Sequence, residues 1–207
     1  RWPLCYLLLA AAVPTVALAR RGAWSPGAAS ALGAVPLLPH PRALECAQDR
    51  LSEKAFVTRL GGTPAPYAPV DSRADLTAAV AEIGTPGILK TRRDGYDGKG
   101  QIRVESEEDA RRGFIALGEK PCVLEQRLEL NLELSVIVAR TSPSKVTTFP
   151  VAENQHADGI LDISLIPARV SEKVAQRARE MALQLAEALD YVGVLAVEFF
   201  LLKDQQL

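Results

Sequence analysis

A glycine-rich loop flanked by two apolar segments constrains the fold of this chain more than any other feature. Ile88-Leu89 leads into Lys90, and residues 95–101 just beyond contain three glycines. Ile102 and Val104 then resume the alternation that is typical of a strand. Glycine lets backbone N–H groups approach an anion closely, because it has no Cβ. Four cations complete the span: Lys90, Arg92, Arg93 and Lys99. The pattern predicts a strand–loop–strand unit that binds a polyphosphate.

The loop differs from the two best-known phosphate-binding loops. A P-loop places Lys and Ser/Thr directly after its second glycine, whereas Gln101 follows Gly100 here. A dinucleotide-binding loop has the spacing G-x-G-x-x-G and opens a helix, whereas here the spacing is reversed and a strand follows. The plainer alternative is a hairpin turn with solvated charges. The lysine on the preceding strand favours the nucleotide interpretation.

Composition is that of an ordinary globular protein. The 207 residues suffice for one large or two small domains, with 48% hydrophobic residues, 24% charged residues and a net charge of -1. Without a basic excess, nucleic-acid binding is not expected. The three cysteines, Cys5, Cys46 and Cys122, are odd in number and lack metal-ligand spacing. This usage favours buried thiols in a reduced, cytoplasmic compartment.

The first 35 residues have a different character. Leu4 to Ala19 is almost wholly apolar, and Ala17-Leu18-Ala19 resembles a signal-peptidase site. Only Arg1 precedes the apolar run, which is short for a membrane span and contains Pro14. A secretory signal stays as the alternative. The favoured interpretation is a fragment with an atypical amino end and no membrane anchor, so residues 1–35 are set apart.

Helices are expected on both sides of the glycine loop. Residues 43–60 carry an apolar stripe and end at Gly61-Gly62, which predicts one helix with a glycine C-cap. The stripe consists of Leu44, Ala47, Leu51, Ala55 and Leu60. Ser72-x-x-Asp75 and Ser106-x-x-Asp109 predict the capping boxes of two short helices. A glycine ends each of them, Gly84 and Gly118.

Strands dominate after Pro121. Short apolar segments predict four of them: Cys122–Gln126, Leu134–Arg140, Val146–Val151 and Ile160–Ile166. Ser171 caps a long helix, and Val194–Leu202 is a further strand. The apolar face of that helix is Val174, Ala178, Met181, Leu185 and Leu189. The elements predict an α+β fold of two small lobes around a nucleotide cleft, residues 36–120 and 121–207, with the second lobe cut at its carboxyl end.

Four features downstream of the loop are candidates to complete a nucleotide site. Glu125-Gln126 ends an apolar strand, where its backbone can meet an adenine edge, and Glu133 is placed to accept ribose hydroxyls. Asn154-Gln155-His156 is expected in a loop between strands. Glu198 interrupts an apolar strand, where a carboxylate is costly unless paired or metal-bound. Mg²⁺ prefers such oxygen ligands. Solvated strand-end charges and a structural histidine remain the plainer alternatives.

Several segments together carry a family resemblance. They are residues 88–101, Ala47 to Arg50, Glu133 to Ser135 with Ala139-Arg140, Phe149 to His156, Asp158 to Leu161 and Tyr191 to Phe200. They resemble the 5-(carboxyamino)imidazole ribonucleotide synthases, the ATPase subunit type of phosphoribosylaminoimidazole carboxylase, which have the ATP-grasp fold. The resemblance runs from about Pro36 to the last residue. The glycine loop and the Glu-Asn-x-His stretch are specific to this family within the wider fold.

The resemblance implies a reaction of purine (IMP) biosynthesis. ATP phosphorylates bicarbonate to carboxyphosphate, which carboxylates the amine of 5-aminoimidazole ribonucleotide and leaves ADP and phosphate. Phosphoryl transfer of this kind depends on positioning and charge neutralisation, which cations, N–H donors and Mg²⁺ supply. A glycine loop that closes also keeps water from the reactive intermediate. The resemblance also implies a possible homodimer. It further implies a functional link to the mutase that rearranges the product.

The resemblance also assigns roles to individual residues. The implied ATP contacts are Arg50, Lys90, Gly95, Tyr96, Asp97, Gly98, Lys99, Gly100, Gln101, Glu125, Gln126, Arg127, Leu128, Glu133 and His156. Lys90 and Lys99 are the implied catalytic residues, and Glu198 is the implied Mg²⁺ ligand. The second metal carboxylate of the family belongs to an Asn-Glu pair on the next strand, beyond the last residue here.

The chain departs from the family at both ends. Arg1 to Ala34 does not resemble the family's amino-terminal glycine loop, and the arginine-rich segment that follows the Asn-Glu pair is missing. We therefore expect no turnover from this piece alone. Two alternatives remain: another ATP-grasp ligase, such as the formate-using glycinamide ribonucleotide transformylase or a biotin carboxylase, and a non-catalytic remnant that binds nucleotide.

Overall fold

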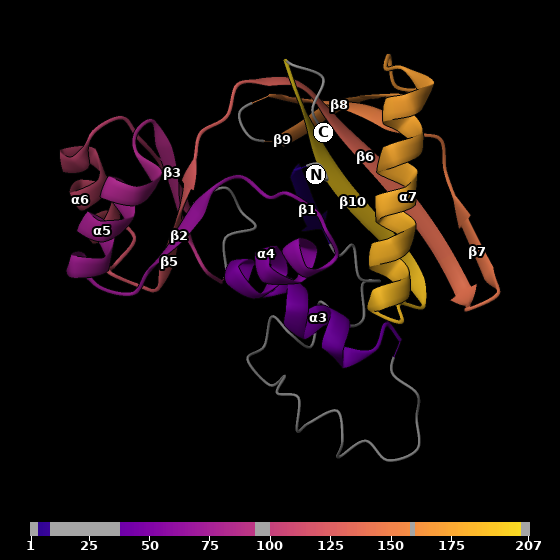
Figure 1. Ribbon diagram of the computed structural model, residues 1–207, viewed down its shortest axis with the longest axis horizontal. Coiled ribbons are helices and arrows are strands. Elements are labelled where there is room, and N and C mark those ends of the chain that lie inside the picture. The colour runs from indigo at the N-terminus through magenta and orange to yellow at the C-terminus, as the bar shows by residue number, and fades with distance from the viewer. Residues whose placement is uncertain (1–3, 9–37, 94–99, 158–159, 204–207) are drawn as a thin grey trace.

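Two antiparallel sheets, each covered by helices, form the two lobes of the protein. The computed structural model describes residues 4–8, 38–93, 100–157 and 160–203, and for residues 4–8 the backbone alone. The smaller lobe, with α5 and α6, lies at one end of the molecule, and the larger lobe, with α7, lies at the other (Figure 1). The α+β class and the two-lobed arrangement agree with the sequence prediction.

The smaller lobe is built around the predicted strand–loop–strand unit. Its four strands are β2 (Tyr67–Val70), β3 (Gly87–Thr91), β4 (Gln101–Val104) and β5 (Cys122–Gln126), in the order β2-β5-β3-β4. Two helices cover the sheet, α5 (Arg73–Ile83) and α6 (Glu107–Ala116). The hydroxyls of Ser72 and Ser106 cap them by accepting from the N–H groups of Asp75 and Asp109, as predicted. Leu89, Leu124 and Phe114 lie in the shared core.

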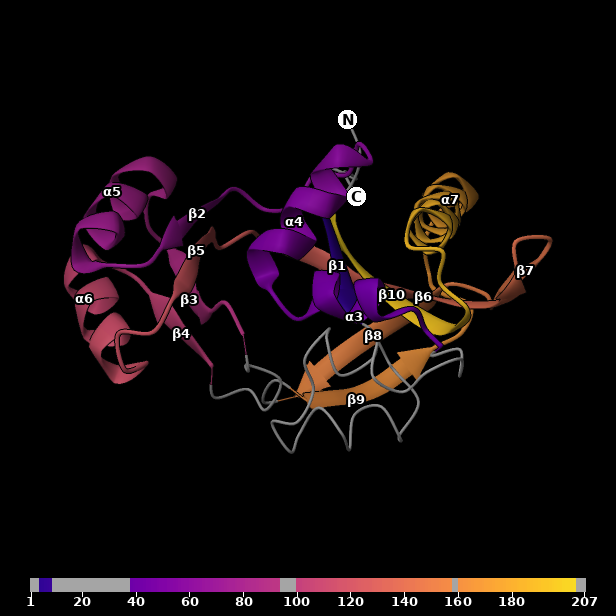
Figure 2. The same ribbon diagram turned by 90° about the horizontal axis from the view of Figure 1, so that it is seen from below.

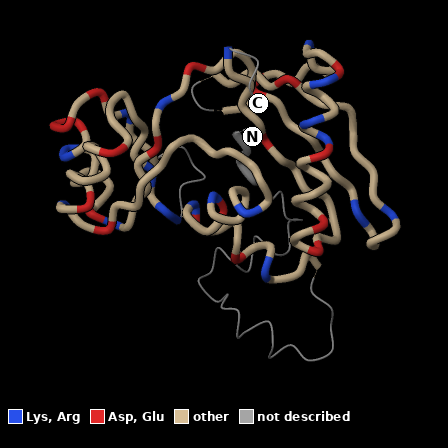
Figure 3. The backbone as a smooth tube through the Cα atoms, in the orientation of Figure 1, with Lys and Arg blue, Asp and Glu red and all other residues tan. Residues whose placement is uncertain are grey.

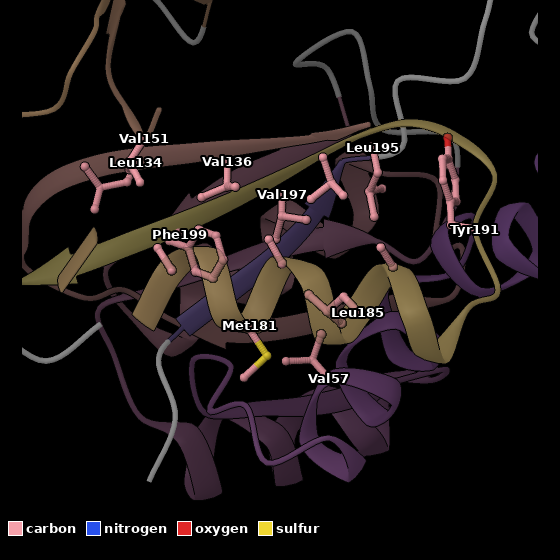
Figure 4. Packing of buried hydrophobic residues seen from close by; sticks show 14 of the residues in the cluster. Val57, Leu134, Val136, Val151, Met181, Leu185, Tyr191, Leu195, Val197 and Phe199 are labelled. Carbon is pink, nitrogen blue, oxygen red and sulfur yellow. The ribbon is translucent and has the colours of Figure 1, made fainter. Parts of the chain in front are cut away.

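The larger lobe is a six-stranded sheet that carries the longest helix. Its strands are β1 (Leu4–Leu8), β10 (Gly193–Leu202), β6 (Leu130–Ser142), β8 (Ala152–Ala157) and β9 (Ile160–Leu165) in that order, with β7 (Lys145–Thr148) paired to β6. Helix α7 (Glu172–Ala188) packs on one face. All five residues of its predicted apolar face are buried. Figure 4 shows Met181 and Leu185 of α7 beside Val197 and Phe199 of β10.

The helix predicted over residues 43–60 is wrong in two respects. The structure has two helices there, α3 (Pro41–Ala47) and α4 (Arg50–Arg59), because the Asp49 carboxylate caps α4 and accepts from the N–H groups of Leu51 and Ser52. The break changes the helical phase, so the stripe residues Leu51, Ala55 and Leu60 are only half-buried. The buried face of α4 is instead Glu53, Lys54, Phe56 and Val57.

The strands after residue 140 also differ from the prediction. Residues 146–151 do not form one strand, because β7 ends at Thr148 and β8 begins at Ala152. Asn154-Gln155-His156 therefore lies on strand β8, paired with β6 and β9, and not in a loop.

Two earlier segments also pair in unexpected places. Residues 4–8, expected in an atypical segment, form β1 beside β10 (Figure 2). Strand β5 follows residue 120 in the chain yet pairs in the smaller lobe.

The surface carries both signs of charge. Figure 3 shows Lys and Arg positions mixed with Asp and Glu positions over both lobes. Among the described residues, no helix has the length and apolar character that a membrane span requires.

Candidate functional site

A cavity of about 370 Å³ opens where the two lobes meet. Its lining consists of Ala65, Ile88, Lys90, Gln101, Arg103, Glu125, Gln126, Arg127, Leu128, Leu130, Glu133 and Phe200. The smaller lobe provides the strand lysine and the end of β5, and the larger lobe provides residues of β6 and β10. Seven of the predicted site residues thus line one space: Lys90, Gln101, Glu125, Gln126, Arg127, Leu128 and Glu133.

Lys90 is held at the cavity by a buried carboxylate. Its Nζ lies 2.9 Å from Oε2 of Glu125, one strand away in the same sheet. The other oxygen of Glu125, Oε1, lies 3.1 Å from Nζ of Lys54 on α4. Lys54 also lies over the Tyr67 ring, with Nζ 5.3 Å from the centroid. The sequence prediction missed Lys54. The burial of Lys54 follows from its position on α4. When the helix begins at Arg50, Lys54 lies on the same face as the buried Phe56 and Val57.

The start of the glycine loop is tied to the start of α4. The guanidinium of Arg92 pairs with the Asp49 carboxylate at 2.7 Å, and Nε of Arg93 lies 3.6 Å from the same group. Burial favours the neutral form of Asp49, but hydrogen bonds from Arg92, Ser52 and Leu51 outweigh it and lower the pKa of Asp49. Two of the four cations assigned to the polyphosphate therefore contact α4.

Arg50 strengthens the same junction. Its side chain donates to the carbonyl of Thr91 at 2.8 Å, and its backbone N–H donates to the carbonyl of Arg92. The carbonyl of Gly100 accepts a hydrogen bond from the N–H of Thr91, which joins the end of β3 to the residue before β4. Gly95, Tyr96, Asp97, Gly98 and Lys99 lie outside the described residues.

The end of β5 presents a specific set of backbone groups to the cavity. The N–H groups of Gln126 and Arg127 donate to the carbonyls of Pro66 and Pro86. Within the described part of the chain, the N–H of Leu128 has no such acceptor. The N–H of Leu128 is therefore available to donate a hydrogen bond to a ligand in the cavity.

A second cavity, of about 350 Å³, shares Leu130 and Glu133 with the first. His156 lies in its lining, and Nδ1 of His156 is 2.7 Å from Oε2 of Glu133. Glu153, which is buried, accepts from the guanidinium of Arg169 in the same lining. Two predicted site residues, Glu133 and His156, are thus in direct contact, because β6 and β8 are neighbouring strands.

Glu198 lies on β10, on the side of the sheet opposite its buried neighbours Val197 and Phe199. Desolvation raises the pKa of Glu198, and the Glu133 carboxylate raises it further, whereas His156 acts in the opposite direction. No described side chain forms an ion pair or hydrogen bond with this carboxylate. The described residues contain no group of three or more His, Cys, Asp or Glu side chains placed to hold a metal.

The family follows from a match that covers most of the chain. Residues 55–207 match the model of the ATP-grasp domain. The chain belongs to the ATP-grasp family. The predicted ATP-grasp fold is therefore confirmed, and the two sheets with the cavity between them are the two lobes of this domain.

Individual relatives and solved structures agree with this assignment. The chain is 49% identical over 170 residues to the N5-carboxyaminoimidazole ribonucleotide synthase of Brucella melitensis, covering 81% of this chain and 47% of the relative. A carboxyaminoimidazole ribonucleotide synthase from Aspergillus clavatus, solved with ATP, has a TM-score of 0.81 at 30% identity, covering 86% of this chain and 47% of that one.

A second structure of the synthase from Aspergillus clavatus contains ADP and 5-aminoimidazole ribonucleotide. It has a TM-score of 0.77 at 28% identity, over 86% of this chain and 47% of that one. The chain spans about half the length of the curated relatives it matches. The resemblance to this family that the sequence motifs predict is confirmed.

Proposed function

We propose that this ATP-grasp chain forms the nucleotide-binding part of an enzyme that carboxylates 5-aminoimidazole ribonucleotide with ATP and bicarbonate. One observation carries the proposal: the cavity between the lobes gathers Lys90, the end of β5 and Glu133, which are far apart in the sequence. The 49% identity to a named synthase supports this substrate rather than that of another ATP-grasp ligase.

Each part of the cavity suits one part of ATP. The N–H of Leu128 and the carbonyls around Gln126 offer hydrogen bonds to the edge of adenine, and Ile88 and Phe200 offer apolar walls. Glu133 accepts hydrogen bonds from ribose hydroxyls. Lys90 pairs with the phosphates, and Gln101 lies in the same lining. In this proposal, phosphate contacts are also assigned to Gly95 to Gly100. Lys99 joins Lys90 as a catalytic cation, while Arg50 and His156 complete the nucleotide contacts.

The chemistry asked of these residues is neutralisation and protection from water. Transfer of the γ-phosphoryl group to bicarbonate spreads negative charge over the phosphate oxygens, and cations held in a water-poor cleft stabilise that charge. The carboxyphosphate formed then gives its carboxyl group to the amine of 5-aminoimidazole ribonucleotide, releasing phosphate and a proton. A covered cleft lengthens the life of such an intermediate.

Glu198 is the Mg²⁺ ligand in this proposal. The carboxylate of Glu198 is half-buried, has a raised pKa and has no partner among the described side chains. Such a carboxylate is unfavourable on an apolar strand unless a cation is bound to it, and Mg²⁺ prefers oxygen ligands of this kind. Held there, Mg²⁺ would supply positive charge that offsets the charge of the phosphates. We also propose a homodimer, a functional link to the mutase that consumes the product, and a cytoplasmic location. The unpaired thiols of Cys46 and Cys122, with pKa values raised to about 11 by burial, support the cytoplasmic location.

Substitution of Glu198 by glutamine is expected to stabilise the free protein and weaken its response to Mg-ATP. The folded-state pKa of Glu198 is raised, so ionisation costs stability as pH rises through that pKa, and the cost is absent below the ordinary value of 4.5. At pH 7.5 the variant should melt on the order of 2 °C higher, the shift that about 1 kcal/mol produces in a domain of this size. At pH 4 the difference should vanish.

Melting curves at both pH values, with and without Mg-ATP, test this expectation. The exposed Glu180→Gln on α7 is the matched control. A lower melting temperature for Glu198→Gln at pH 7.5, or an undiminished Mg²⁺-dependent rise with ATP, would contradict the assignment of Glu198.

The function itself is tested in two steps. Mg-ATP at 100 times its Kd should stabilise this chain by about 2.7 kcal/mol, whereas absence of any shift at millimolar ATP would favour a non-binding remnant. A chimera then replaces the matching 170 residues of the Brucella melitensis synthase with those of this chain. It should release ADP only with bicarbonate and 5-aminoimidazole ribonucleotide together. ADP release driven by formate, or release indifferent to the ribonucleotide, would point to another ATP-grasp ligase.

A further inference from the structure

Three charged side chains form a buried ionic cluster beside the cavity: Lys54, Glu125 and Lys90. Glu125 lies between the two lysines, with one carboxylate oxygen 3.1 Å from Lys54 and the other 2.9 Å from Lys90. The exposed fractions of the side chains are 4% for Lys54, 2% for Glu125 and 11% for Lys90. Only Lys90 and Glu125 line the cavity, and Lys54 lies behind them.

Two lysines share the one carboxylate of this cluster. Burial lowers the pKa of Lys54, the Glu125 carboxylate opposes that effect, and the charge of Lys90 adds to it. Glu53 also opposes it, as the last of these influences. A second lysine on one buried carboxylate is therefore unfavourable for Lys54 in the nucleotide-free protein. The charge of Lys54 becomes more favourable when a bound anion in the cavity neutralises part of the positive charge of Lys90.

Binding of a polyphosphate changes what Lys90 must do. A phosphate in the cavity competes with Glu125 for the ammonium group of Lys90, and each charge-assisted bond to phosphate weakens the bond to the carboxylate. Without Lys54, Glu125 would then be left with neither of the two ammonium groups that contact its buried carboxylate, which is unfavourable. Lys54 is already in place on the far oxygen of that carboxylate.

We propose that Lys54 is the counter-ion that holds Glu125 while Lys90 turns to the nucleotide phosphates. Lys54 is a positioning residue, because it reaches the nucleotide only through Glu125 and Lys90. This inference rests on the proposed binding of ATP. It adds a residue from α4, a helix whose Phe56 and Val57 pack in the core of the larger lobe, to the site between the two lobes.

A merely structural role for Lys54 predicts a different pattern of binding. If Lys54 only supported the fold, its loss would weaken all ligands of the cavity alike. If it frees Lys90, its loss should affect ligands with phosphates and spare a ligand without them. The effect should also depend on the negative charge of Glu125.

The test compares Mg-ADP and adenosine by displacement of a fluorescent ADP analogue from the full chain. Lys54→Met should weaken Mg-ADP binding about tenfold and adenosine binding less than about twofold. The exposed Lys173→Met on α7 is the matched control and should change neither. In the Glu125→Gln background the buried anion is gone, so Glu125→Gln alone and Glu125→Gln combined with Lys54→Met should bind Mg-ADP equally, within about twofold.

Other outcomes overturn the inference. Equal losses for Mg-ADP and adenosine, no loss for Lys54→Met, or a difference of about tenfold between the two variants that carry Glu125→Gln would each do so. If Lys54→Met does not fold, the comparison within the Glu125→Gln background still decides. If the native chain binds neither ligand, the proposed function fails and the inference fails with it; if the native chain binds Mg-ADP, only the inference is at stake.

Discussion

Replacement of Lys90 by methionine is expected to weaken Mg-ATP and Mg-ADP binding by about 10- to 100-fold while the protein stays folded. A hydrogen bond between charged groups contributes about 1.5–3 kcal/mol, and each 1.4 kcal/mol is a factor of ten in Kd. The fold tolerates the change because Glu125 keeps Lys54 at 3.1 Å and is not left as an isolated buried charge. Lys90 lines the cavity and does not belong to the apolar core of the smaller lobe.

Calorimetric titration with ATP, ADP and adenosine measures this effect, and a melting curve checks the fold. Lys173→Met again serves as the control, since Lys173 is exposed on α7 and does not line the cavity. Unchanged ADP affinity in a folded Lys90→Met variant would remove Lys90 from the site. Equal loss of adenosine and ADP affinity would indicate a collapsed cavity instead of a lost phosphate contact.

The smaller lobe could be read from the sequence because its signals are local. Alternation around Leu89 and Ile102, the Ser72 and Ser106 caps, and the glycines after each helix depend on neighbours within a few residues. Lys90 and the end of β5 are predictable for the same reason, since a polar residue near the end of an apolar strand marks where the chain leaves the sheet. Their meeting in one cavity followed from the family resemblance and not from these local patterns.

The errors concern features that depend on distant parts of the chain. Asp49 breaks the expected helix by capping α4 through the N–H groups of Leu51 and Ser52, a local signal that the apolar stripe across residues 43–60 obscures. Arg92, 43 residues away, also holds this carboxylate, and no local pattern contains that second contact. The break then moves Lys54 to the buried face, where Glu125 is its partner. The sequence predicts a loop at His156 because the middle of β8, from Glu153 to His156, is wholly polar and lacks the residues that favour strands.

Strand β1 illustrates the same limit from another side. An apolar run near an amino end suits a leader, a strand or a buried helix equally well, and only pairing decides. Here Leu4–Leu8 pairs antiparallel with β10, nearly the whole chain away. This pairing depends on the backbone groups that β10 leaves open on the side away from β6. The sequence of residues 4–8 carries no information about them.

Substitution of Phe199 by alanine is expected to destabilise the protein by about 3–5 kcal/mol, the usual cost of removing a buried phenylalanine ring. Phe199 has no exposed surface and lies between β10 and α7, near Met181 and Val197 (Figure 4). The ring fills space that rigid neighbours on a strand and a long helix cannot close, so a cavity remains. Against a total stability of about 5–15 kcal/mol, this loss is large enough to unfold part of the population.

Its neighbour Phe200 provides the matched comparison, because successive residues of a strand face opposite sides of the sheet. Phe200 is half-buried and lines the cavity between the lobes. Urea denaturation of both variants should show the larger loss for Phe199→Ala, whereas nucleotide titration of the folded protein should show the larger loss for Phe200→Ala. A larger stability loss for Phe200→Ala would mean that the core lies on the other face of β10, and the cavity assignment would fall with it. Because adjacent residues of one strand are compared, strand propensity and position in the chain are nearly equal for the two substitutions, and the difference reports the face alone.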